Sequence, residues 1–477
     1  MAGPRPTRRP NIRRSGRERA AASEPTAQRA GAHDGAERWR GGVVSTADAV
    51  IGAILTDLDN TAHRALVVDS PPGAGKSTLV VRAARQLAAA DDEQRMIVAQ
   101  TNEQVDDLID RLATADPGLR IGRLSAGDYR PSARIDRENV DVANRPADLE
   151  RCAIVIGTAA KWATLDEGRW SYAIVDEAYQ MRSDMLLRIA NRFERGLFVG
   201  DPGQLDPFAT VDSDRWAGLS WDPTMSAVAV MLNHNDGIPV HTLPVSWRLP
   251  PSAAAVVSAA FYPFAPFQAG TRPEQRRMEF STRGLRGPVD DVLDEAATHG
   301  WAYYELPARH TLRTDGEAVA VIADLTCRLL ERGGIAHSEQ GTREVDATRI
   351  AVGTAHRDQA QAVRDALAPT IAAEVTVDTA NRLQGREYDV TVILHPLSGR
   401  RDAGAFHLEA GRLCVLASRH RHACIVVGRR GIDELLDAHP SAEPVYLGVP
   451  VKFPDGWEAN QAVLSRLAAH RIPAAVR

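Results

Sequence analysis

The sequence predicts an α/β protein with two tandem domains, each built around a parallel sheet. Short apolar runs alternate with segments of helical periodicity along most of the 477 residues, and no internal repeat is visible. This alternation is typical of parallel sheets whose faces are covered by the connecting helices. The chain is also long enough for two or three domains, each with its own core. The clearest strand–helix pair joins the apolar run 65–68 to the helical stretch 79–87 through a glycine-rich turn.

That turn, SPPGAGKS at 70–77, has the context that a phosphate-binding loop requires, since it follows a strand and opens a helix. Gly73 and Gly75 allow backbone N–H groups to approach phosphate oxygens, and the helix N-terminus adds partial positive charge. Lys76 is expected to reach the β- and γ-phosphates, and the Ser77 hydroxyl to bind Mg²⁺. The predicted nucleotide-binding residues of this loop are Pro72, Gly73, Ala74, Gly75, Lys76, Ser77 and Thr78.

Lysine is rare in this chain, which makes Lys76 informative. Three of the 57 basic residues are lysines, at positions 76, 161 and 452, and the other 54 are arginines. A composition so rich in arginine should replace any lysine for which arginine can substitute. We therefore interpret Lys76 as a residue whose compact ammonium group does what a planar guanidinium cannot. The alternative, a chance glycine turn before a helix, is disfavoured by this context.

Two carboxylates at the end of a later strand complement the loop. The apolar run 172–175 leads directly into Asp176 and Glu177. Asp176 is expected to hold Mg²⁺ together with Ser77, and Glu177 to polarise the attacking water. A further apolar run at 196–199 leads into GDPGQLDPF, in which Gln204 is placed to sense the γ-phosphate. The adjacent carboxylates Asp176 and Glu177 are a weak signal by themselves. Because they lie 100 residues after Lys76 in a chain of alternating strands and helices, they indicate a nucleotide hydrolase.

The first 42 residues differ in composition from the rest. They hold ten arginines and four acidic residues, with prolines, small residues and almost no apolar side chains. This composition predicts a disordered basic arm. Since the whole chain has a net charge of −5, the remainder is acidic, and any nucleic acid must bind in a local groove there. A nucleic-acid contact and a merely solubilising tail are both compatible with the arm.

Cysteine usage and hydropathy exclude several classes. The four cysteines lie far apart with no C-x-x-C pair, which argues against a zinc module or a disulfide framework and suits a reducing cytoplasm. No apolar run approaches the roughly 18 residues that a membrane helix needs, and no apolar segment follows the charged N-terminus as in a secretory signal. We therefore expect a cytoplasmic protein without a membrane segment.

Other stretches are less regular. Residues 117–149 are polar, arginine-rich and weakly patterned, which indicates a small insertion, and residues 263–300 are rich in proline, glycine and arginine, which indicates irregular structure. Regular patterning resumes from 301 and includes VTVDTANRLQGREYDVTVIL at 375–394 and GRLCVLASRHRHACIVVG at 411–428.

The order of these motifs resembles the superfamily 1 helicases, and within them the group of the nonsense-mediated mRNA decay helicase and the Dna-type replication helicases (Upf-like and Dna-like motors). The resemblance covers roughly residues 67–428. SPPGAGKS resembles motif I, AQTNEQVDDL motif Ia, VDEAYQ motif II, GDPGQLDP motif III, SWRLPP motif IV, VDTANRLQGREYD motif V, and RLCVLASRHRHACIVVG motif VI. Three positions depart from the family pattern: Ser70 replaces a glycine, Asp206 a proline, and Asn381 an aspartate.

The resemblance implies roles for further residues. Arg248 and Arg419 match arginine fingers that complete the hydrolytic site, so that the implied catalytic set is Lys76, Asp176, Glu177, Gln204, Arg248 and Arg419. Gly385 and Glu387 match the nucleotide-contacting part of motif V. Thr101, Asn102, Thr158 and Thr379 match positions that grip a nucleic-acid strand. A glutamine that would read adenine is not evident between 43 and 60, which leaves the choice of nucleotide base open.

The resemblance also implies an architecture and an activity. We expect two RecA-like P-loop domains, at 43–238 (motifs I–III) and 239–447 (motifs IV–VI), between the arm at 1–42 and a C-terminal tail at 448–477. The expected activity is that of an ATP- and Mg²⁺-dependent helicase or translocase acting on single-stranded nucleic acid, with 5′→3′ polarity. DNA and RNA both remain possible substrates. An ATP-driven clamp without unwinding is the main alternative. A nucleotide kinase has no obvious use for Arg248, Gln384 and Arg419, and a catalytically dead scaffold would not need all of these residues.

Overall fold

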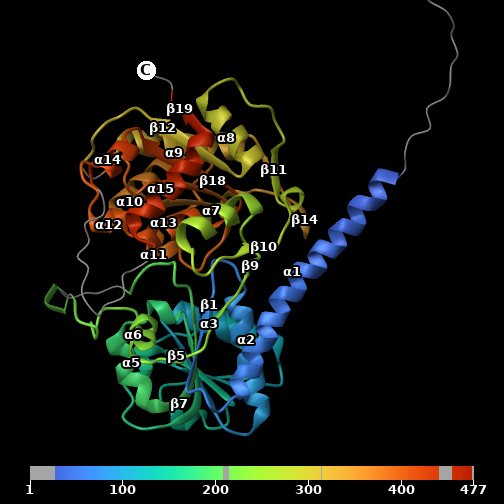
Figure 1. Ribbon diagram of the computed structural model, residues 1–477, viewed down its shortest axis with the longest axis vertical. Coiled ribbons are helices and arrows are strands. Elements are labelled where there is room, and N and C mark those ends of the chain that lie inside the picture. Colours follow the sequence, from blue (N-terminus) through green and yellow to red (C-terminus); the bar gives the residue numbers. More distant parts are fainter. Residues whose placement is uncertain (1–26, 208–213, 217, 313, 440–453, 475–477) are drawn as a thin grey trace, which may run out of the picture. The chain divides into compact units, whose positions relative to one another are not determined.

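The computed structural model describes residues 27–207, 214–216, 218–312, 314–439 and 454–474 (Figure 1). Its contacts divide the chain into two units, residues 1–42 and residues 43–477. The helix α1 (Ala27–Asp59) runs across this division. All the sheets described below belong to the second unit.

The first sheet is parallel throughout. Among the described residues it has eight strands, in the order β4-β3-β5-β2-β6-β7-β1-β8. The strands are β1 (Ala65–Asp69), β2 (Arg95–Ala99), β3 (Ile121–Leu124), β4 (Val140–Ala143), β5 (Ile154–Thr158), β6 (Trp170–Asp176), β7 (Phe193–Gly200) and β8 (Val240–Thr242). Because the strands are parallel, the loops that follow β1, β6 and β7 emerge side by side at one edge of the sheet.

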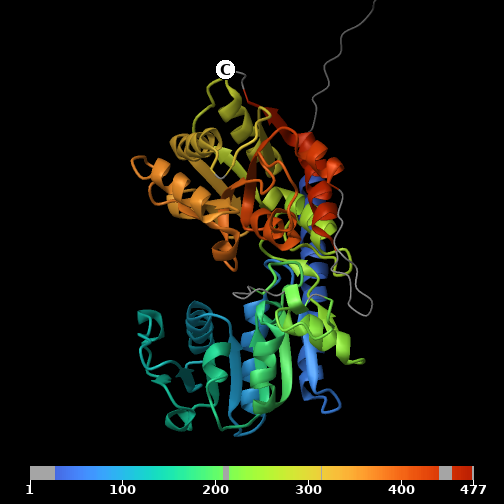
Figure 2. The same ribbon diagram turned by 90° about the vertical axis from the view of Figure 1, so that its left-hand side faces the viewer.

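Both faces of this sheet are buried, which explains why its central strands are continuous apolar runs. In β1, Leu66 and Val68 contribute to one hydrophobic cluster and Val67 to the cluster on the opposite face. Helices α2 (Lys76–Ala90) and α3 (Asn102–Ala115) and the end of α1 pack on the first face. Helices α4 (Ala159–Trp162), α5 (Ser183–Ile189) and α6 (Ala227–His234) pack on the second, and Figure 2 gives a second view of this arrangement.

The second sheet repeats the plan. Within the described residues six parallel strands run in the order β16-β15-β17-β18-β12-β19. They are β12 (Trp301–Leu306), β15 (Ile350–Thr354), β16 (Thr376–Thr379), β17 (Tyr388–Leu394), β18 (His420–Arg429) and β19 (Arg471–Pro473). One face is covered by α8 (Pro288–His299), α9 (Gly316–Glu331) and α10 (Arg357–Leu367). The other is covered by α7 (Pro251–Phe261), α11 (Ala380–Leu383), α13 (Ala410–Ala417) and α15 (Gly456–Leu467).

Smaller elements complete the second half of the chain. The strands β9 (Val245–Ser246) and β10 (Gln268–Ala269) pair in parallel. An antiparallel sheet with the order β11-β13-β14 is formed by β11 (Arg277–Phe280), β13 (Gly334–Ser338) and β14 (Gly341–Glu344). The short helices are α12 (Ala405–Leu408), α14 (Ile432–Ala438) and the 3₁₀ turns η1 (Ala133–Ile135), η2 (Pro146–Leu149), η3 (Ala178–Gln180), η4 (Ala190–Arg192), η5 (Asp214–Trp216), η6 (Pro273–Gln275), η7 (Ala347–Arg349) and η8 (Ala468–His470).

The structure corrects several expectations about segments. Residues 27–42 of the expected disordered arm are helical, since alanine, glutamine, glutamate and arginine all favour a helix and α1 continues into buried residues such as Ile54 and Leu58. Residues 1–26 of the arm lie outside the described residues. The expected C-terminal tail instead contributes α15, which buries Val463 and Leu467, and β19, which pairs with β12.

Three further boundaries differ from expectation. The first sheet extends beyond the expected division after 238, because β8 pairs with β1. The expected insertion at 117–149 holds β3 and β4, which extend the first sheet. The expected irregular stretch 263–300 ends in α8, whose Val292 and Leu293 are buried. The division into domains at the predicted positions otherwise stays a prediction.

Candidate nucleotide-binding site

A cavity of about 490 Å³ lies where the loops after β1, β6 and β7 emerge. Residues from both halves of the chain line it. They are Ser70, Pro71, Pro72, Gly73, Ala74, Gly75, Lys76, Ser77, Thr78, Glu103, Gln104, Asp107, Leu108, Arg111, Asp176, Glu177, Asp201, Gln204, Arg248, Gln384, Gly385, Arg386, Glu387 and Arg419. Every residue predicted to be catalytic or to contact the nucleotide is in this set.

The glycine-rich loop adopts a conformation that its glycines make possible. Gly73 and Gly75 have positive φ angles of 72° and 90°, which other residues rarely adopt. The carbonyl of Gly73 accepts a hydrogen bond from the Trp247 backbone N–H at 2.8 Å, and the carbonyl of Pro72 accepts one from the Ser246 hydroxyl at 2.6 Å. A Cβ atom at Gly73 would lie 2.2 Å from the Cβ of Arg248. The loop is therefore in direct contact with the segment that resembles motif IV.

Lys76, the first residue of α2, faces the two carboxylates. Its Nζ forms an ion pair with Glu177 and lies 3.7 Å from Asp176 Oδ1. Burial lowers the pKa of Lys76, but the neighbouring charges of Glu177 and Asp176 outweigh burial and raise it overall. Burial raises the pKa of Asp176, and the Lys76 charge offsets only part of this rise. The three groups form one buried charge cluster, in which a phosphate would find a cation and a metal ion would find carboxylate oxygens.

Glu177 has an unusual backbone. Its φ of 51° is positive, as for no other non-glycine residue in the described part of the chain. Such a conformation costs of order 1–3 kcal/mol and is found mainly at functional sites. The Glu177 N–H donates a hydrogen bond to Asp176 Oδ1 at 2.9 Å. The turn into η3 therefore directs both carboxylates into the cavity.

The donor set fits Mg²⁺. The Ser77 hydroxyl and the Asp176 carboxylate both line the cavity. Mg²⁺ prefers oxygen ligands, and beside nucleotide phosphates it takes only one or two of them from the protein. Ser77 and Asp176 are thus the residues that would hold the ion.

Asp201, which follows β7, is a cavity residue that sequence analysis did not single out. It accepts hydrogen bonds from the Tyr262 hydroxyl, at 2.6 Å, and from the Gln204 side-chain amide. Burial raises the pKa of Asp201 to about 6, although these hydrogen bonds act in the opposite direction. Since Tyr262 is the residue that caps α7, Asp201 connects Gln204 to the second half of the chain. A carboxylate directly after a buried strand was the available signal.

The two predicted arginine fingers differ in their environment. Arg248 Nε donates to Glu387 Oε2 at 3.1 Å, and Arg421 donates to the other Glu387 oxygen at 2.7 Å. Arg419 is buried and donates to the Val415 carbonyl at 3.1 Å and to the Ser418 hydroxyl at 2.7 Å. Burial, and then the nearby Arg248 charge, lower the pKa of Arg419 to about 10. It pairs with no carboxylate among the described residues.

The residues predicted to grip nucleic acid lie outside this cavity. Thr101 caps α3 and accepts from Gln104 N at 3.2 Å, while Thr158 caps α4 and accepts from Lys161 N at 3.2 Å. Thr101 lies just after β2 and Thr158 ends β5, and these two strands are neighbours in the first sheet. Asn102 accepts a hydrogen bond from Arg123 at 2.8 Å. Thr379 instead ends β16 in the second sheet.

A second cavity, of about 300 Å³, adjoins these positions. Its lining includes Gln100, Ala159 and Asn381, which are chain neighbours of Thr101, Thr158 and Thr379 or lie close to them. Gln384 lines both this cavity and the nucleotide cavity. The lining of the second cavity thus holds chain neighbours of the predicted strand-gripping residues but not those residues themselves.

One more group of side chains has metal-ligating chemistry. Glu295, His299 and His470 offer ligand atoms within 4.8 Å of one another. Glu295 accepts from the His470 ring at 2.8 Å, and none of the three side chains lines either cavity described here.

Comparison with known families gives two matches. A family model described as an AAA domain matches residues 52–212, and a second model, also described as an AAA domain, matches residues 226–431. Both domain families are typical of superfamily 1 helicases. The chain belongs to this superfamily. No curated protein matches the sequence, and no helix in the described residues is long and apolar enough to cross a membrane.

The solved structures that are similar to this chain include helicases of arteriviruses. The PRRSV helicase is 15% identical, with 81% of this chain and 56% of that chain covered and a TM-score of 0.40. The arterivirus nonstructural protein 10 helicase is 14% identical over 79% of this chain and 62% of that chain, with a TM-score of 0.42. Its complex with DNA is 14% identical over 76% and 60%, with a TM-score of 0.39. The chain thus spans about three fifths of the length of these proteins.

Proposed function

We propose that this protein is an ATP-dependent helicase or translocase that moves 5′→3′ on single-stranded nucleic acid. The observation that carries the proposal is the lining of one cavity by Lys76 and Glu177 from the first sheet together with Arg248 and Arg419 from the segments that resemble motifs IV and VI. Phosphoryl transfer is catalysed mainly by positioning and by neutralising charge on the phosphate oxygens. A cavity that gathers cations from two sheets around two carboxylates meets this requirement.

Each residue has a defined task in this proposal. Lys76 and the backbone N–H groups at 73–78 bind the β- and γ-phosphates, and Ser77 and Asp176 hold Mg²⁺, which neutralises charge on the phosphate oxygens. Glu177 accepts the proton of the attacking water. Gln204 contacts the γ-phosphate side of the cavity, and Arg248 and Arg419 stabilise the charge that develops in the transition state. Gly385 and Glu387 contact the nucleotide from the motif V side.

Coupling to nucleic acid follows from the second cavity. Gln384 lines both cavities, so a nucleotide that draws it toward the phosphates also alters the second cavity, which serves in this proposal as the groove for the strand. Thr101, Asn102 and Thr158 hold the strand from the first sheet, and Thr379 holds it from the second. A reducing, cytoplasmic location is part of the proposal. It is supported by the four cysteines, none of which forms a disulfide: Cys152, Cys327, Cys414 and Cys424.

The second candidate function is an ATP-driven clamp that holds a strand without unwinding a duplex. It uses the same cavities, and the small size of the β11-β13-β14 sheet favours it, since duplex separation often needs a larger accessory domain. A nucleotide kinase is disfavoured, because the cavity is lined by Arg248 and Arg419 as well as by the phosphate loop.

The test is the rate of ATP hydrolysis with single-stranded DNA, single-stranded RNA, duplex or no nucleic acid. We expect stimulation by one or both single strands and none by blunt duplex. Lys76→Ala should abolish the stimulated rate and weaken nucleotide binding. Hydrolysis that does not respond to any nucleic acid would contradict both the helicase and the clamp.

A further inference from the structure

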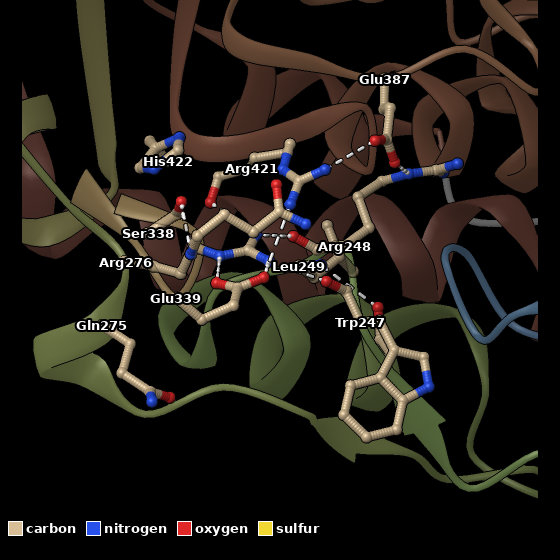
Figure 3. A network of polar contacts seen from close by, with 12 residues as sticks. Trp247, Arg248, Leu249, Gln275, Arg276, Ser338, Glu339, Glu387, Arg421 and His422 are labelled. Atoms are coloured by element: carbon tan, nitrogen blue, oxygen red, sulfur yellow. Dashed lines mark hydrogen bonds and ion pairs between the residues drawn. The ribbon is translucent and has the colours of Figure 1, made fainter. Parts of the chain in front are cut away.

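Arg276 lies outside every segment that resembles a helicase motif, yet it is one of the most completely bonded residues in the structure. It follows η6, and its side chain is fully buried. Its guanidinium donates to the backbone carbonyls of Trp247, at 2.9 Å, and Arg248, at 2.7 Å. The same group pairs with both oxygens of Glu339, at 2.8 and 2.7 Å (Figure 3). A planar fork that satisfies two carbonyls and a carboxylate at once is a contact that lysine cannot replace.

Glu339 reaches this position from the turn between β13 and β14. Burial alone would raise the pKa of Glu339, but hydrogen bonds from Arg276 and the charge of Arg421 lower it to about 2. The carboxylate is therefore ionised at neutral pH. It lies 3.6 Å from Arg421, whose other contact is Glu387 at 2.7 Å.

These contacts form a closed path around Arg248. Its backbone carbonyl is held by Arg276, and its side chain by Glu387, which Arg421 connects back to Glu339 (Figure 3). On the opposite side, the preceding residue donates to the Gly73 carbonyl at 2.8 Å. The segment that carries Arg248 is thus fixed between the phosphate loop and the Arg276–Glu339 pair.

The simpler explanation of the Arg276–Glu339 pair is that it only stabilises the fold. The burial of the pair argues against this explanation. Removing an arginine side chain and a carboxylate from water costs several kcal/mol per ion, so a buried pair contributes little net stability. Such a pair gives precise geometry instead, because its hydrogen bonds have fixed directions. The two carbonyls that it fixes belong to the proposed finger and to the residue before it.

We propose that Arg276 and Glu339 are positioning residues that set the place of the Arg248 guanidinium in the nucleotide cavity. Neither residue lines that cavity, so neither is catalytic. The inference rests on the proposed function of Arg248 and extends it: the antiparallel β11-β13-β14 sheet, through Glu339, becomes part of the hydrolytic machinery.

The test compares Arg276→Met with Arg277→Met. Arg277 is the next residue, is exposed, and pairs with Glu279 at 3.2 Å, so it is a matched control. Arg276→Met should lower kcat for ATP on the order of a hundredfold, the scale expected when a catalytic group is displaced by about 1 Å. The KM for ATP should change little, and Arg277→Met should behave as the wild type. Equal rates for the two variants would overturn the proposal.

A double-mutant cycle separates positioning from general damage. In an Arg248→Ala background, Arg276→Met should cause no further loss of kcat, because the group that it positions is gone. A further hundredfold loss there would overturn the proposal. If Arg276→Met does not fold, Glu339→Gln takes its place in the same cycle and should show the same non-additivity with a smaller loss. A wild type without ATP hydrolysis would instead contradict the proposed function, so the two failures are distinguishable.

Discussion

At the level of single residues, the backbone conformation of Glu177 determines where its carboxylate lies. Its left-handed backbone and the hydrogen bond from its N–H to Asp176 turn the strand exit into the cavity. A change to glutamine keeps the size of the side chain but removes the carboxylate that we propose as the base.

We predict that Glu177→Gln binds ATP as the wild type does and hydrolyses it at least about a hundredfold more slowly, the scale of a lost general base. Rapid-quench hydrolysis and a fluorescent-nucleotide titration measure the two quantities. Glu167→Gln, an exposed glutamate on the same part of the chain, is the control. Unimpaired turnover in Glu177→Gln would exclude it as the base.

Asp201 predicts a pH dependence of stability. Its pKa in the folded protein is about 6, against 3.8 for the unfolded chain, so the folded state binds the proton more tightly. Asp201 therefore contributes on the order of 2–3 kcal/mol to the free energy of unfolding below about pH 4. This contribution is lost as the pH rises to 6 and above. Denaturation of the wild type and Asp201→Asn at pH 4.5 and 7 measures it. The wild type should lose stability relative to the variant at the higher pH, and a constant difference would contradict the assignment.

The sequence predicts residues that the structure gathers around one cavity, whereas the four residues predicted to grip nucleic acid lie outside that cavity. Lys76 begins the helix after β1, and Asp176 and Glu177 lie at the end of β6. A parallel sheet brings the loops after its strands together at one edge. Asp201 and Tyr262 were missed because their pairing joins residues 61 positions apart, and no local pattern reports such a contact. Arg276 was missed for the same reason, since its partners lie in separate segments, at 247–248 and at 339.

At the level of elements, continuous apolar runs identify strands that are buried on both faces, such as β2 and β6. Strands at or near the sheet edges carry polar residues and escape this pattern: β4 is only partly buried, and β8 is short and partly exposed. The closing elements α15 and β19 escape it as well, because they are separated from the rest of the second sheet by residues 440–453, which lie outside the described residues. Edge elements are defined by their neighbours more than by their own sequence.

Helix α13 makes a contact between elements that can be tested. A Cβ atom on Gly411 would lie 2.4 Å from the Gln204 carbonyl oxygen, 2.5 Å from the Gln204 carbonyl carbon and 2.7 Å from Leu205 N, all of which are backbone atoms. We predict that Gly411→Ala displaces the Gln204 loop and lowers kcat by roughly ten- to a hundredfold. Gly404→Ala is the control, because its nearest neighbour would be 3.8 Å away. Steady-state kinetics decide, and equal rates for the two variants would mean that the loop position is not critical.

At the level of the whole molecule, the direction of movement depends on which sheet grips the strand more tightly when the nucleotide is bound. The motif resemblance gives the loops expected to grip the strand but not their relative affinities. The 5′→3′ polarity is therefore taken from the resemblance of motifs Ia, II, V and VI. We predict displacement of a bound block from the 3′ end of an oligonucleotide, and unwinding that needs a 5′ overhang. Streptavidin displacement from either end measures the polarity, and release from the 5′ end alone would reverse it.

The most direct test of the account is single-turnover ATP hydrolysis by Arg419→Ala and Arg248→Ala, with nucleotide affinity measured in parallel. Both arginines belong to the second half of the chain, whereas Lys76 and Glu177 belong to the first. A site completed from both halves predicts that each variant binds ATP nearly as the wild type does and hydrolyses it on the order of a thousandfold more slowly, while Lys76→Ala loses affinity and turnover together. Hydrolysis near the wild-type rate in both arginine variants would show that the first half hydrolyses ATP alone.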